Sequence, residues 1–396
     1  MIRGLTRAIQ GVRVGLAVSC AGLLAACGSQ RAAVTSPAPA AVTVPLGTSL
    51  ATAQGTWAVA VMGGSAAAHN NFWQLFVRPA GASRWSLVTP QGVADNGGLV
   101  AAGASTSLTV GFRPNQNLTY SPLATSTDTG KNWTPGLLDA DLADSPGAIA
   151  VSPSGRTLAL LQDGTITTAP TASAAAAGQW TPLTTRNALA ASAPGRSCGL
   201  TGVNAVSFGP NKDPMAAGSC ARPGVAGVFT DTGGTWRSAG LVPPGKGAGI
   251  GTVQVLGLAA TAGGNVALLA TGNSLLAAWW NGTRWTVSAP VTAGPVAAST
   301  VRALGFGADG SAWLLLGGGR AETIDGTGGS WQALPPVPSG TTALAPPGTA
   351  TLAPGTGGAY DALAVSGSKL TVWRLAQGAW AKVQQITVPI VYGSSD

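Results

Sequence analysis

A short segment of this chain has the spacing of a nucleophilic serine. Gly195, Ser197 and Gly199 match the pattern G-x-S-x-G, in which a serine sits on a sharp turn between a strand and a helix. Such a serine also needs a histidine base, and the chain holds a single histidine, His69, far away in the sequence. No helix is expected after Gly199. The pattern therefore indicates no hydrolase site.

Acidic residues are too few and too scattered to form an evident catalytic pair. Aspartate and glutamate together number 13, and most of the aspartates fall in predicted turns. Hydrolysis of a glycosidic bond usually needs two carboxyl groups that flank the bond. Asp139, Asp141 and Asp144 could coordinate Ca²⁺ through their oxygens, but three carboxylates in one loop are more often solvated. We therefore predict no catalytic residue, no metal and no cofactor.

The first 26 residues have the pattern of an export signal. The positive start is supplied by Arg3, Arg7 and Arg13. Residues 14–26 form an apolar run that is too short to span a membrane as a stable helix. The run ends in LAAC at 24–27, which resembles the lipobox of bacterial lipoproteins. That resemblance implies cleavage before Cys27 and a diacylglyceryl thioether on its sulfur. The alternative is an ordinary signal peptide in which Cys27 is incidental.

The remaining cysteines predict a disulfide. Cys20 would leave with the signal peptide and Cys27 would carry lipid, so Cys198 and Cys220 remain, 22 positions apart. Two such cysteines in an oxidising compartment most simply form one bridge, which contributes about 3 kcal/mol in the loop-entropy account. A metal site is the weaker interpretation, because His69 is distant and no second cysteine pair exists.

Composition indicates the class of fold that must position these residues. Of the 396 residues 45% are hydrophobic and only 9% are charged, which excludes disorder throughout the chain. Glutamate occurs once and glycine 58 times, so a helical bundle is not expected. Abundant Val, Thr and Trp between Gly- and Pro-rich turns favour an all-β chain.

The net charge points away from nucleic acid. The formal charge is +8, but three of these charges lie in the segment predicted to be removed. The remainder is spread thinly, and no run of basic residues exists. A nucleic-acid surface needs Lys and Arg clustered along one face. We therefore predict no nucleic-acid partner.

A recurring tryptophan indicates the architecture. The repeated residues are Trp85, Trp133, Trp180, Trp236, Trp285, Trp331 and Trp380. Their spacings run from 46 to 56 residues, and a Gly-containing turn usually precedes each one. Three short β-like runs lie between consecutive tryptophans; in the fifth unit these are 253–260, 265–270 and 274–280, and 284–288 completes the set. Four strands per unit, seven times, predict a seven-bladed β-propeller with four-stranded antiparallel blades.

Two of the units carry a sharper motif, S-x-D-x-G-x-x-W. The residues of the two matches are Ser126, Asp128, Gly130, Trp133, Asp231, Gly233 and Trp236. The first match is complete, the second has Phe229 in place of Ser, and 325–331 is a degenerate copy. The motif resembles the Asp-box, or BNR, repeat of sialidase-like propellers. Its Asp can accept backbone hydrogen bonds, its Gly can adopt the left-handed conformation, and its Trp can pack between blades. The resemblance implies a hairpin between the two outer strands of a blade, which marks the fold and not an active site.

The catalytic residues of sialidases do not carry over to this chain. Those enzymes use three arginines that bind the substrate carboxylate, a Tyr nucleophile with a Glu partner, and an Asp that acts as the acid/base. Here Glu322 is the one glutamate, and Tyr120, Tyr360 and Tyr392 lie in no recognisable catalytic context. Sialidases also have six blades, whereas the tryptophan repeat predicts seven. We therefore expect a chain that is not an enzyme.

A binding face is predicted in the loops that join strand 2 to strand 3 of a blade and in those that join one blade to the next, which line the face where propellers usually hold ligands. The candidate residues are His69, Asn71, Arg113, Asn115, Arg222, Arg320 and Lys369. The excess of cations among these loops suits an anionic or hydroxyl-rich partner; the alternative is that polar residues simply occupy loops. Trp279 and Trp280 could stack on sugars, but at least one of them is expected in the core, because alternate residues of a strand pack between sheets.

These observations predict three parts of the chain. They are a signal peptide over 1–26, the lipidated Cys27 with a flexible tether over 27–41, and a propeller over 42–396. The protein would lie in a bacterial cell envelope, anchored through its lipid to the outer face of the cytoplasmic membrane. We expect a non-catalytic binding or scaffolding module for an envelope protein or glycan. The alternatives are a glycan-acting hydrolase or lyase and a structural subunit of a larger envelope assembly.

Overall fold

The computed structural model divides the chain into two units, 1–40 and 41–396. The residues that it describes all lie in the second unit and are 47–63, 71–92, 99–104, 107–112, 120–139, 145–170, 179–240, 251–293, 300–326, 328–338, 349–355 and 357–388. The predicted signal peptide, Cys27 and the tether lie outside them. None of the helices in the described part has the length and apolar character needed to cross a bilayer.

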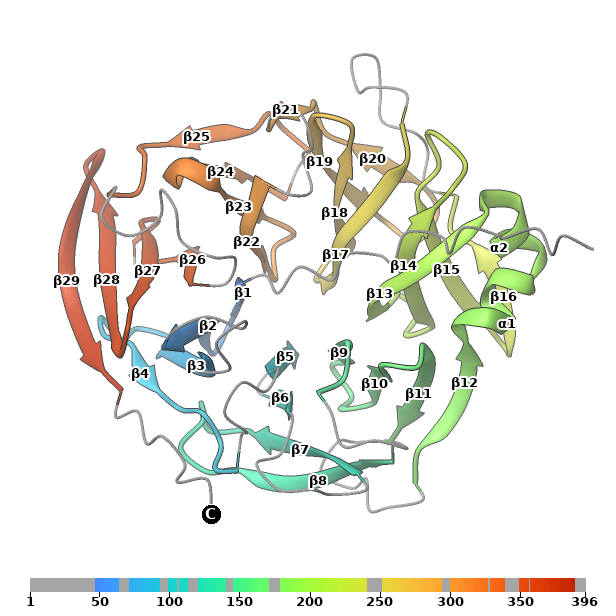
Figure 1. Cartoon of the computed structure of the whole chain (residues 1–396), viewed down its shortest axis with the longest axis horizontal. Coiled ribbons are helices and arrows are strands. Elements are labelled where there is room, and N and C mark those ends of the chain that lie inside the picture. The colour runs from blue at the N-terminus through green and yellow to red at the C-terminus, as the bar shows by residue number, and fades with distance from the viewer. Residues whose placement is uncertain are drawn as a thin grey trace, which may run out of the picture. The chain divides into compact units, whose positions relative to one another are not determined.

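The second unit is an all-β propeller whose six sheets form a ring (Figure 1). Five sheets have four or five strands each. In each of them the first four strands form an antiparallel meander, in which each strand lies farther from the centre of the ring than the one before it. The sixth sheet has eight strands, because a parallel pair between β1 (Gly47–Thr52) and β22 (Val301–Gly307) joins two four-stranded meanders. All other pairings between the described strands are antiparallel.

The remaining elements follow one another in chain order. The strands of the first three meanders are β2 (Gly55–Gly63), β3 (Asn71–Pro79), β4 (Ser86–Leu87), β5 (Leu99–Ala104), β6 (Ser107–Phe112), β7 (Tyr120–Ser126), β8 (Thr134–Asp139), β9 (Ala148–Val151), β10 (Thr157–Leu160), β11 (Thr165–Ala169) and β12 (Thr181–Thr185). After the helices α1 (Arg186–Ala191) and α2 (Ala193–Cys198) come β13 (Leu200–Phe208), β14 (Pro214–Cys220), β15 (Gly227–Thr232), β16 (Thr235–Ser238), β17 (Val253–Thr261), β18 (Gly264–Thr271), β19 (Ser274–Trp280), β20 (Trp285–Val287) and β21 (Val291–Thr292). The last are β23 (Ala312–Leu316), the 3₁₀ turn η2 (Gly317–Gly319), β24 (Ala321–Ile324), β25 (Gln332–Leu334), β26 (Ala350–Pro354), β27 (Tyr360–Ser366), β28 (Lys369–Ala376) and β29 (Ala379–Thr387).

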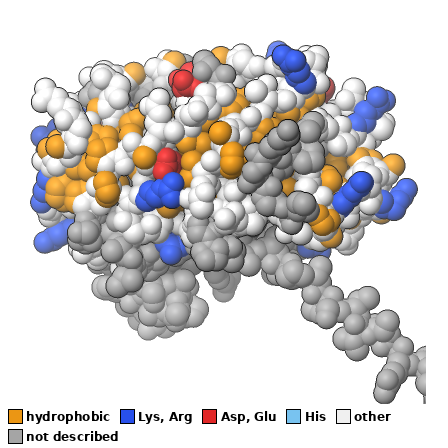
Figure 2. All heavy atoms as spheres, turned by 90° about the horizontal axis from the view of Figure 1, so that it is seen from above, with side chains coloured by type: hydrophobic (Ala, Val, Ile, Leu, Met, Phe, Trp, Pro, Cys, Tyr) orange, Lys and Arg blue, Asp and Glu red, His pale blue; other side chains and the backbone are white. Residues whose placement is uncertain are grey.

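Burial follows the position of a strand within its meander. All eight residues of β18 are buried, because this second strand lies between neighbouring sheets on both faces. Its sequence GNVALLAT is accordingly apolar without the alternation of a half-exposed strand. The outermost strand β29 is mainly exposed and carries the polar residues Lys382, Gln384 and Gln385. Seen from the side, the rim shows a band of hydrophobic side chains, with Lys and Arg scattered along it and fewer Asp or Glu (Figure 2).

The core consists of separate clusters of buried apolar residues, each between two meanders that are neighbours in the ring. One cluster, for example, contains Leu108 of β6 with Trp57 and Leu75 of the first meander. Another joins the last meander to the first through Leu363, Leu370 and Phe76. The ring is therefore held by the interfaces between successive sheets, as expected for repeated units that cannot bury both faces alone.

Five of the seven repeated tryptophans pin their meander to the one before it. Four indole N–H groups donate to a backbone carbonyl near the end of the preceding outer strand: Trp133 to Val88, Trp180 to Leu137, Trp285 to Ala239 and Trp380 to Pro335. Trp331 donates instead to the Ser288 hydroxyl. The repeat in the sequence thus reflects a repeated contact, which places an amphipathic ring where one end is buried and the N–H finds a partner.

Between the first meander and the last one, the tryptophan contact is different. Trp85 donates its indole N–H to the Asp361 carboxylate over 2.9 Å. Asp361 is fully buried and pairs with Arg374 at 2.7 Å and with Arg78 at 3.5 Å. Gln384 adds a hydrogen bond to each backbone polar group of Trp85. The hydrogen bond and charge of Asp361 raise the pKa of Arg374, whereas burial lowers that of Arg78.

The first strand supplies a second closing contact. β1 begins its own meander and does not complete the sheet of the last one. Instead it pairs with β22, and the buried Ser49 hydroxyl accepts a hydrogen bond from the Trp313 indole and donates one to the Leu352 carbonyl. Residues 43–46 and 389–392 lie outside the described residues. The ring is thus closed by side chains and one parallel strand pair.

An insertion before β13 contains two short helices that the sequence analysis did not predict. Thr185 caps α1 by accepting a hydrogen bond from Ala188, and Ser192 caps α2 in the same way from Gly195. Gly199 ends α2 in the left-handed conformation. The Ser–Cys pair of the G-x-S-x-G pattern therefore lies inside a helix and not on a strand-to-helix turn, and a strand follows it, as predicted.

The predicted disulfide between Cys198 and Cys220 is confirmed. The two Cα atoms are 5.3 Å apart, and the bridge joins the end of α2 to the end of β14. It thereby ties the segment that leads into the innermost strand of this meander to the second strand.

Candidate binding site

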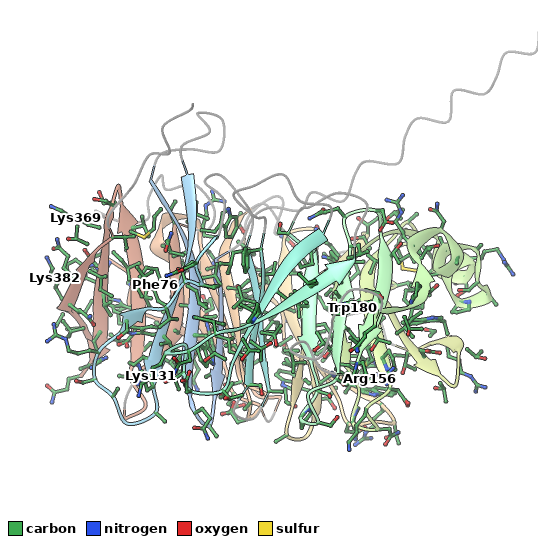
Figure 3. The ribbon with its side chains drawn as sticks, turned by 90° about the horizontal axis from the view of Figure 1, so that it is seen from below. Phe76, Lys131, Arg156, Trp180, Lys369 and Lys382 are labelled. Atoms are coloured by element: carbon green, nitrogen blue, oxygen red, sulfur yellow. A yellow bond between two sulfur atoms is a disulfide. The ribbon has the colours of Figure 1, made fainter. Side chains whose placement is uncertain are left out.

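The described candidates for the predicted binding face lie between the second and third strands of a meander or at the start of the third strand. Arg222 follows β14, Arg320 precedes β24, Lys369 begins β28 and Asn71 begins β3. Figure 3 shows Lys369 at one edge of the ring and Lys131 and Arg156 at the opposite edge. His69, Arg113 and Asn115 lie outside the described residues. The role of these candidates in binding stays a prediction.

Two of these candidates are engaged in contacts within the fold. Arg320 pairs with Glu322 at 2.7 Å and donates to the Thr292 carbonyl, although its side chain is 48% exposed. Arg222 donates to the Ser197 carbonyl of α2. Asn71, Lys369 and Arg320 belong to neighbouring meanders, whereas the β17–β20 meander separates them from Arg222. The described cations therefore form no single cluster by topology.

The first Asp-box match forms the hairpin expected between two outer strands, β7 and β8. The Ser126 hydroxyl donates to Asp128 Oδ1 at 2.8 Å and accepts from the Gly130 N–H at 2.8 Å. Asp128 also accepts from the backbone N–H and side-chain amide of Asn132. These hydrogen bonds, those from Asn132 first, lower the pKa of Asp128 to about 2. Its role is to hold the loop, as the resemblance implied.

The second match folds differently although its spacing is the same. Asp231 lies within β15 and pairs with Trp236 of β16, so that only Gly233 and Gly234 form the turn. Both glycines have positive φ, as a two-residue hairpin requires. Asp231 is buried, and this burial raises its pKa. The Trp236 indole N–H is buried without a partner among the described residues.

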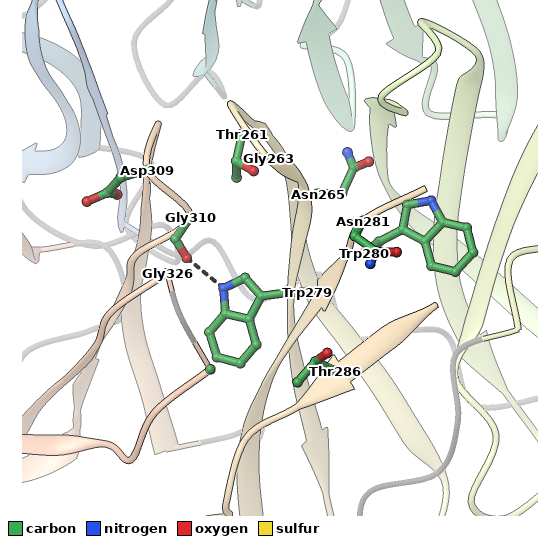
Figure 4. Close-up of a pocket in the computed structure, with 11 residues that line it drawn as sticks. Thr261, Gly263, Asn265, Trp279, Trp280, Asn281, Thr286, Asp309, Gly310 and Gly326 are labelled. Atoms are coloured by element: carbon green, nitrogen blue, oxygen red, sulfur yellow. Dashed lines mark hydrogen bonds between the residues drawn. The ribbon is translucent and has the colours of Figure 1, made fainter. Parts of the chain in front are cut away.

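A pocket lies on the edge of the ring opposite to the predicted binding face. Its lining comes from the turns that follow first and third strands, between the β17–β20 and β22–β25 meanders (Figure 4). The lining residues are Thr261, Gly263, Asn265, Trp279, Trp280, Asn281, Thr286, Asp309, Gly310, Gly326 and Gly328. The cavity volume is about 210 Å³.

The two neighbouring tryptophans of β19 point in opposite directions (Figure 4). Trp279 faces the β22–β25 meander, where its indole N–H donates to the Gly310 carbonyl at 2.8 Å. Trp280 turns to the other side and lies against Trp285, with ring centroids 5.4 Å apart. Thr286 pairs with Trp279 across β19 and β20, so these two side chains share a face of the sheet. Trp279 is therefore the aromatic side chain that forms a wall of the pocket.

Several polar atoms of the pocket have no partner among the described residues. Oδ1 of Asp309 accepts hydrogen bonds from the N–H and the hydroxyl of Ser311, whereas Oδ2 has no partner among the described residues. No hydrogen bond engages the hydroxyls of Thr261 and Thr286 within the described part of the chain. The pocket thus presents an indole, one carboxylate oxygen and two hydroxyls.

Asn265, at the back of the pocket, is structural. Its amide N–H₂ donates to the Ser207 hydroxyl and to the carbonyl of Phe208, which joins β18 to the preceding meander. Its Oδ1 is buried without a partner among the described residues. The carboxamide is thus committed to the joint between two meanders.

This pocket was not predicted from the sequence, because the expected binding face lies on the opposite edge of the ring. The Trp279–Trp280 pair was noted, and the prediction that one of the two faces the core is consistent with their opposed directions. The proximity of Asp309 and Thr261 to Trp279 depends on how two meanders pack, which the tryptophan spacing alone does not give. No group of three His, Cys, Asp or Glu side chains in the described residues is placed to bind a metal ion.

Comparisons with known proteins found similar solved structures but no similar sequence. No protein-family model and no curated protein sequence matches the chain. Ycf48 from Cyanidioschyzon merolae is 17% identical, with 87% of this chain and 96% of that chain covered and a TM-score of 0.44. A putative 6-phosphogluconolactonase from Bacteroides uniformis is 14% identical, with 83% and 96% covered and a TM-score of 0.47. The Aleuria aurantia lectin, a six-bladed propeller, is 13% identical, with 75% and 96% covered and a TM-score of 0.40.

Proposed function

We propose that this chain is a membrane-anchored, extracytoplasmic lipoprotein whose propeller is a non-catalytic binding or scaffolding module for an envelope protein or glycan. The observation that carries the binding function is the pocket beside Trp279, where Asp309, Thr261 and Thr286 present polar atoms that the described part of the fold does not use. A concave site with an apolar wall and a few convergent polar groups is typical of ligand pockets.

A binding role is also supported by the number of carboxyl groups in the pocket. Asp309 is the one carboxyl side chain among its described lining residues. Glycosidases of the usual kinds need two, one to protonate the leaving group and one to act as nucleophile or base. The pocket therefore favours binding over hydrolysis of a glycan.

The propeller is proposed to have seven blades. This count treats the two meanders of the eight-stranded sheet, β1–β4 and β22–β25, as separate blades. It is supported by the buried clusters, because one of them lies between β22–β25 and β26–β29 and another between β26–β29 and β1–β4. The parallel pair between β1 and β22 then connects two blades near the ring's centre.

Envelope anchoring is tested by growth of bacteria that express the full chain in radiolabelled palmitate. We expect label on the wild-type protein and in the membrane fraction. Cys27→Ser should lose the label and fail to be processed, because the lipid is attached to this sulfur. Wild-type protein that is exported without label would overturn the lipoprotein proposal and favour an ordinary signal peptide.

The binding function is tested by capture from envelope extract with the full chain in detergent. One set of columns carries wild type, one the pocket variant Thr286→Val with Asp309→Asn, and one the opposite-face variant Arg222→Ala with Lys369→Ala. We expect a protein or glycan that the wild type retains and one of the two variants loses. Arg320 is left unchanged, because it holds the nearly buried Glu322. Equal retention by all three proteins would overturn both candidate faces, and a partner at fixed stoichiometry would identify a structural subunit.

A further inference from the structure

We infer that the pocket beside Trp279 binds a single neutral sugar ring, which deepens the proposed function and rests on it. The pocket volume is about 210 Å³. This is small, since pockets that bind drug-sized ligands usually measure about 300–1,000 Å³. A site of this size admits one ring, such as the end residue of a glycan. It is too small to enclose an extended chain.

The wall of the pocket supplies an apolar surface for one face of such a ring. Trp279 is half-buried and fixed by its hydrogen bond to Gly310, so the indole is held in place before any ligand arrives. A pyranose presents axial C–H groups on one face, and an indole is a large, rigid, apolar partner for them. A held indole costs little further entropy on binding.

Glycines keep the indole accessible. A Cβ atom added to Gly310 would lie 3.5 Å from Trp279 Cδ1, and one added to Gly328 would lie 3.9 Å from Trp279 Cε3 and 3.5 Å from Thr286 Cγ2. Both glycines have positive φ, which other residues adopt only with strain. Any larger side chain at these two positions would reach into the space beside the ring.

The polar atoms of the pocket match hydroxyl groups. Asp309 Oδ2 is an acceptor, and the hydroxyls of Thr261 and Thr286 can each donate and accept. A sugar hydroxyl also does both, so it can bond a carboxylate with its hydrogen and a threonine with its oxygen. A quaternary ammonium could use the indole and the carboxylate but would leave the threonine hydroxyls without a role.

The charge of the pocket selects against acidic sugars. Among the described lining residues, Asp309 is the one charged side chain, and no Lys or Arg accompanies it. A ligand carboxylate or phosphate would meet a like charge without a compensating cation, which is unfavourable. The ligand class that the geometry assigns is therefore a neutral hexose.

The test titrates the full chain in detergent with the methyl glycosides of D-glucose, D-galactose and D-mannose, and with N-acetylneuraminic acid and choline for comparison. Binding is measured by saturation-transfer NMR and by calorimetry. We expect at least one neutral glycoside to bind and to be weakened roughly tenfold by Thr286→Val and by Asp309→Asn, since each removes or weakens one hydrogen bond.

Matched variants separate recognition from folding. Trp279→Phe removes the indole wall and should abolish binding, whereas Trp180→Phe replaces one of the repeated tryptophans in a meander that does not line the pocket and should leave the affinity unchanged. Thr286 is exposed at the rim of the sheet, so its substitution by Val tests the site without disturbing the core.

Each other outcome overturns the inference. Binding that survives both Thr286→Val and Asp309→Asn would place the sugar elsewhere, and no binding by a folded wild type would exclude the ligand class. Choline that binds in an Asp309-dependent manner would identify a cation site. The proposed function fails separately, when the envelope capture described above yields no component that either variant loses.

Discussion

The two Asp-box segments, 126–133 and 229–236, have the same spacing but form different hairpins. In the first, Ser126 organises a wide loop, and Asp128 closes it by accepting from Asn132. In the second, Phe229 occupies the serine position and is buried in the core, so that the strands pair up to a two-residue turn. The two segments thus differ at the first position of the motif: the hydroxyl of Ser126 goes with a wide loop, and the apolar Phe229 goes with strands that pair up to the turn.

The supports of the two hairpins differ as well. The Trp133 indole pins the first hairpin to the Val88 carbonyl of the preceding meander. The Trp236 indole has no such partner in the described part of the chain. Instead, Phe229 and Trp236 pack against Leu189 of α1 and the Cys198–Cys220 bridge. A repeat position can therefore keep its residue type while a local insertion takes over its structural role.

The largest expected effect comes from the first residue of each motif. Phe229→Ala should reduce the free energy of unfolding by about 3–5 kcal/mol, the usual cost of emptying a buried phenylalanine site. Ser126→Ala removes hydrogen bonds but little core volume and should cost about 1–2 kcal/mol. Denaturant unfolding of the two variants measures both values. Equal losses would contradict the assignment of one position to the core and the other to the loop.

Removal of the disulfide should act on the second hairpin alone. Cys198→Ser combined with Cys220→Ser should lower stability by roughly 3 kcal/mol, the value for a loop of about this length. Hydrogen exchange should quicken in β15 and β16, which α2 contacts, and stay unchanged in β7 and β8. Exchange that quickens equally in both hairpins would show that the bridge stabilises the ring as a whole.

The glycines of the two turns provide a matched pair. Gly130 and Gly233 both have positive φ, and an L-residue there costs roughly 1–2 kcal/mol. A Cβ on Gly130 would also lie 2.7 Å from Val88, whereas nothing lies within 4 Å of one on Gly233. Gly130→Ala should therefore lose about 2–3 kcal/mol once this clash is added, and Gly233→Ala about 1 kcal/mol. The order of the two thermal midpoints checks the prediction; a reversed order would refute it.

The smallest expected effect is a pair of shifts of the thermal midpoint that have opposite signs. The pKa of Asp128 is lowered from 3.8 to about 2, so its stabilising contribution is complete above pH 4 and is lost as the pH falls toward 2. The pKa of Asp231 is raised by burial, so its ionised form destabilises the fold as the pH rises through that pKa. At pH 7, Asp128→Asn should lower the thermal midpoint, and Asp231→Asn should raise it.

Difference curves of the thermal midpoint against pH, from pH 2 to 7, measure this last pair. The curve for Asp128→Asn should converge with wild type at the acid end, and so should the curve for Asp231→Asn, from the opposite side. Shifts of the same sign at pH 7 would contradict the different environments of the two carboxyl groups.

Much of the propeller could be predicted from the sequence, because its repeat is a repeated contact. The predicted strands of the fifth unit differ from β17, β18, β19 and β20 by at most one residue at each end. The disulfide followed from cysteine number and from the predicted compartment. These features depend on local pattern and on residues that recur at a fixed distance along the chain.

Other features depend on contacts between distant segments and were not predictable in this way. The carboxylate of Asp361 meets Trp85 and Arg78 across the closure, 276 and 283 positions away, and no local motif marks it. The pocket combines Trp279 with Asp309 of another meander. The helices α1 and α2 did leave local signals, the caps Thr185, Ser192 and Gly199, which an all-β expectation overlooked.

The closure of the ring has a consequence for how the protein reaches its folded state. The bonds from Ser49 to Leu352 and between Trp85 and Gln384 join residues 303 and 299 positions apart. The first meander therefore emerges from synthesis or export with one face uncovered, and its partner arrives only when almost the whole chain has appeared. Contacts so remote in sequence slow folding, and uncovered strands invite wrong pairings in the interval. The first meander is thus the first part of the propeller to be synthesised and the last to complete its contacts.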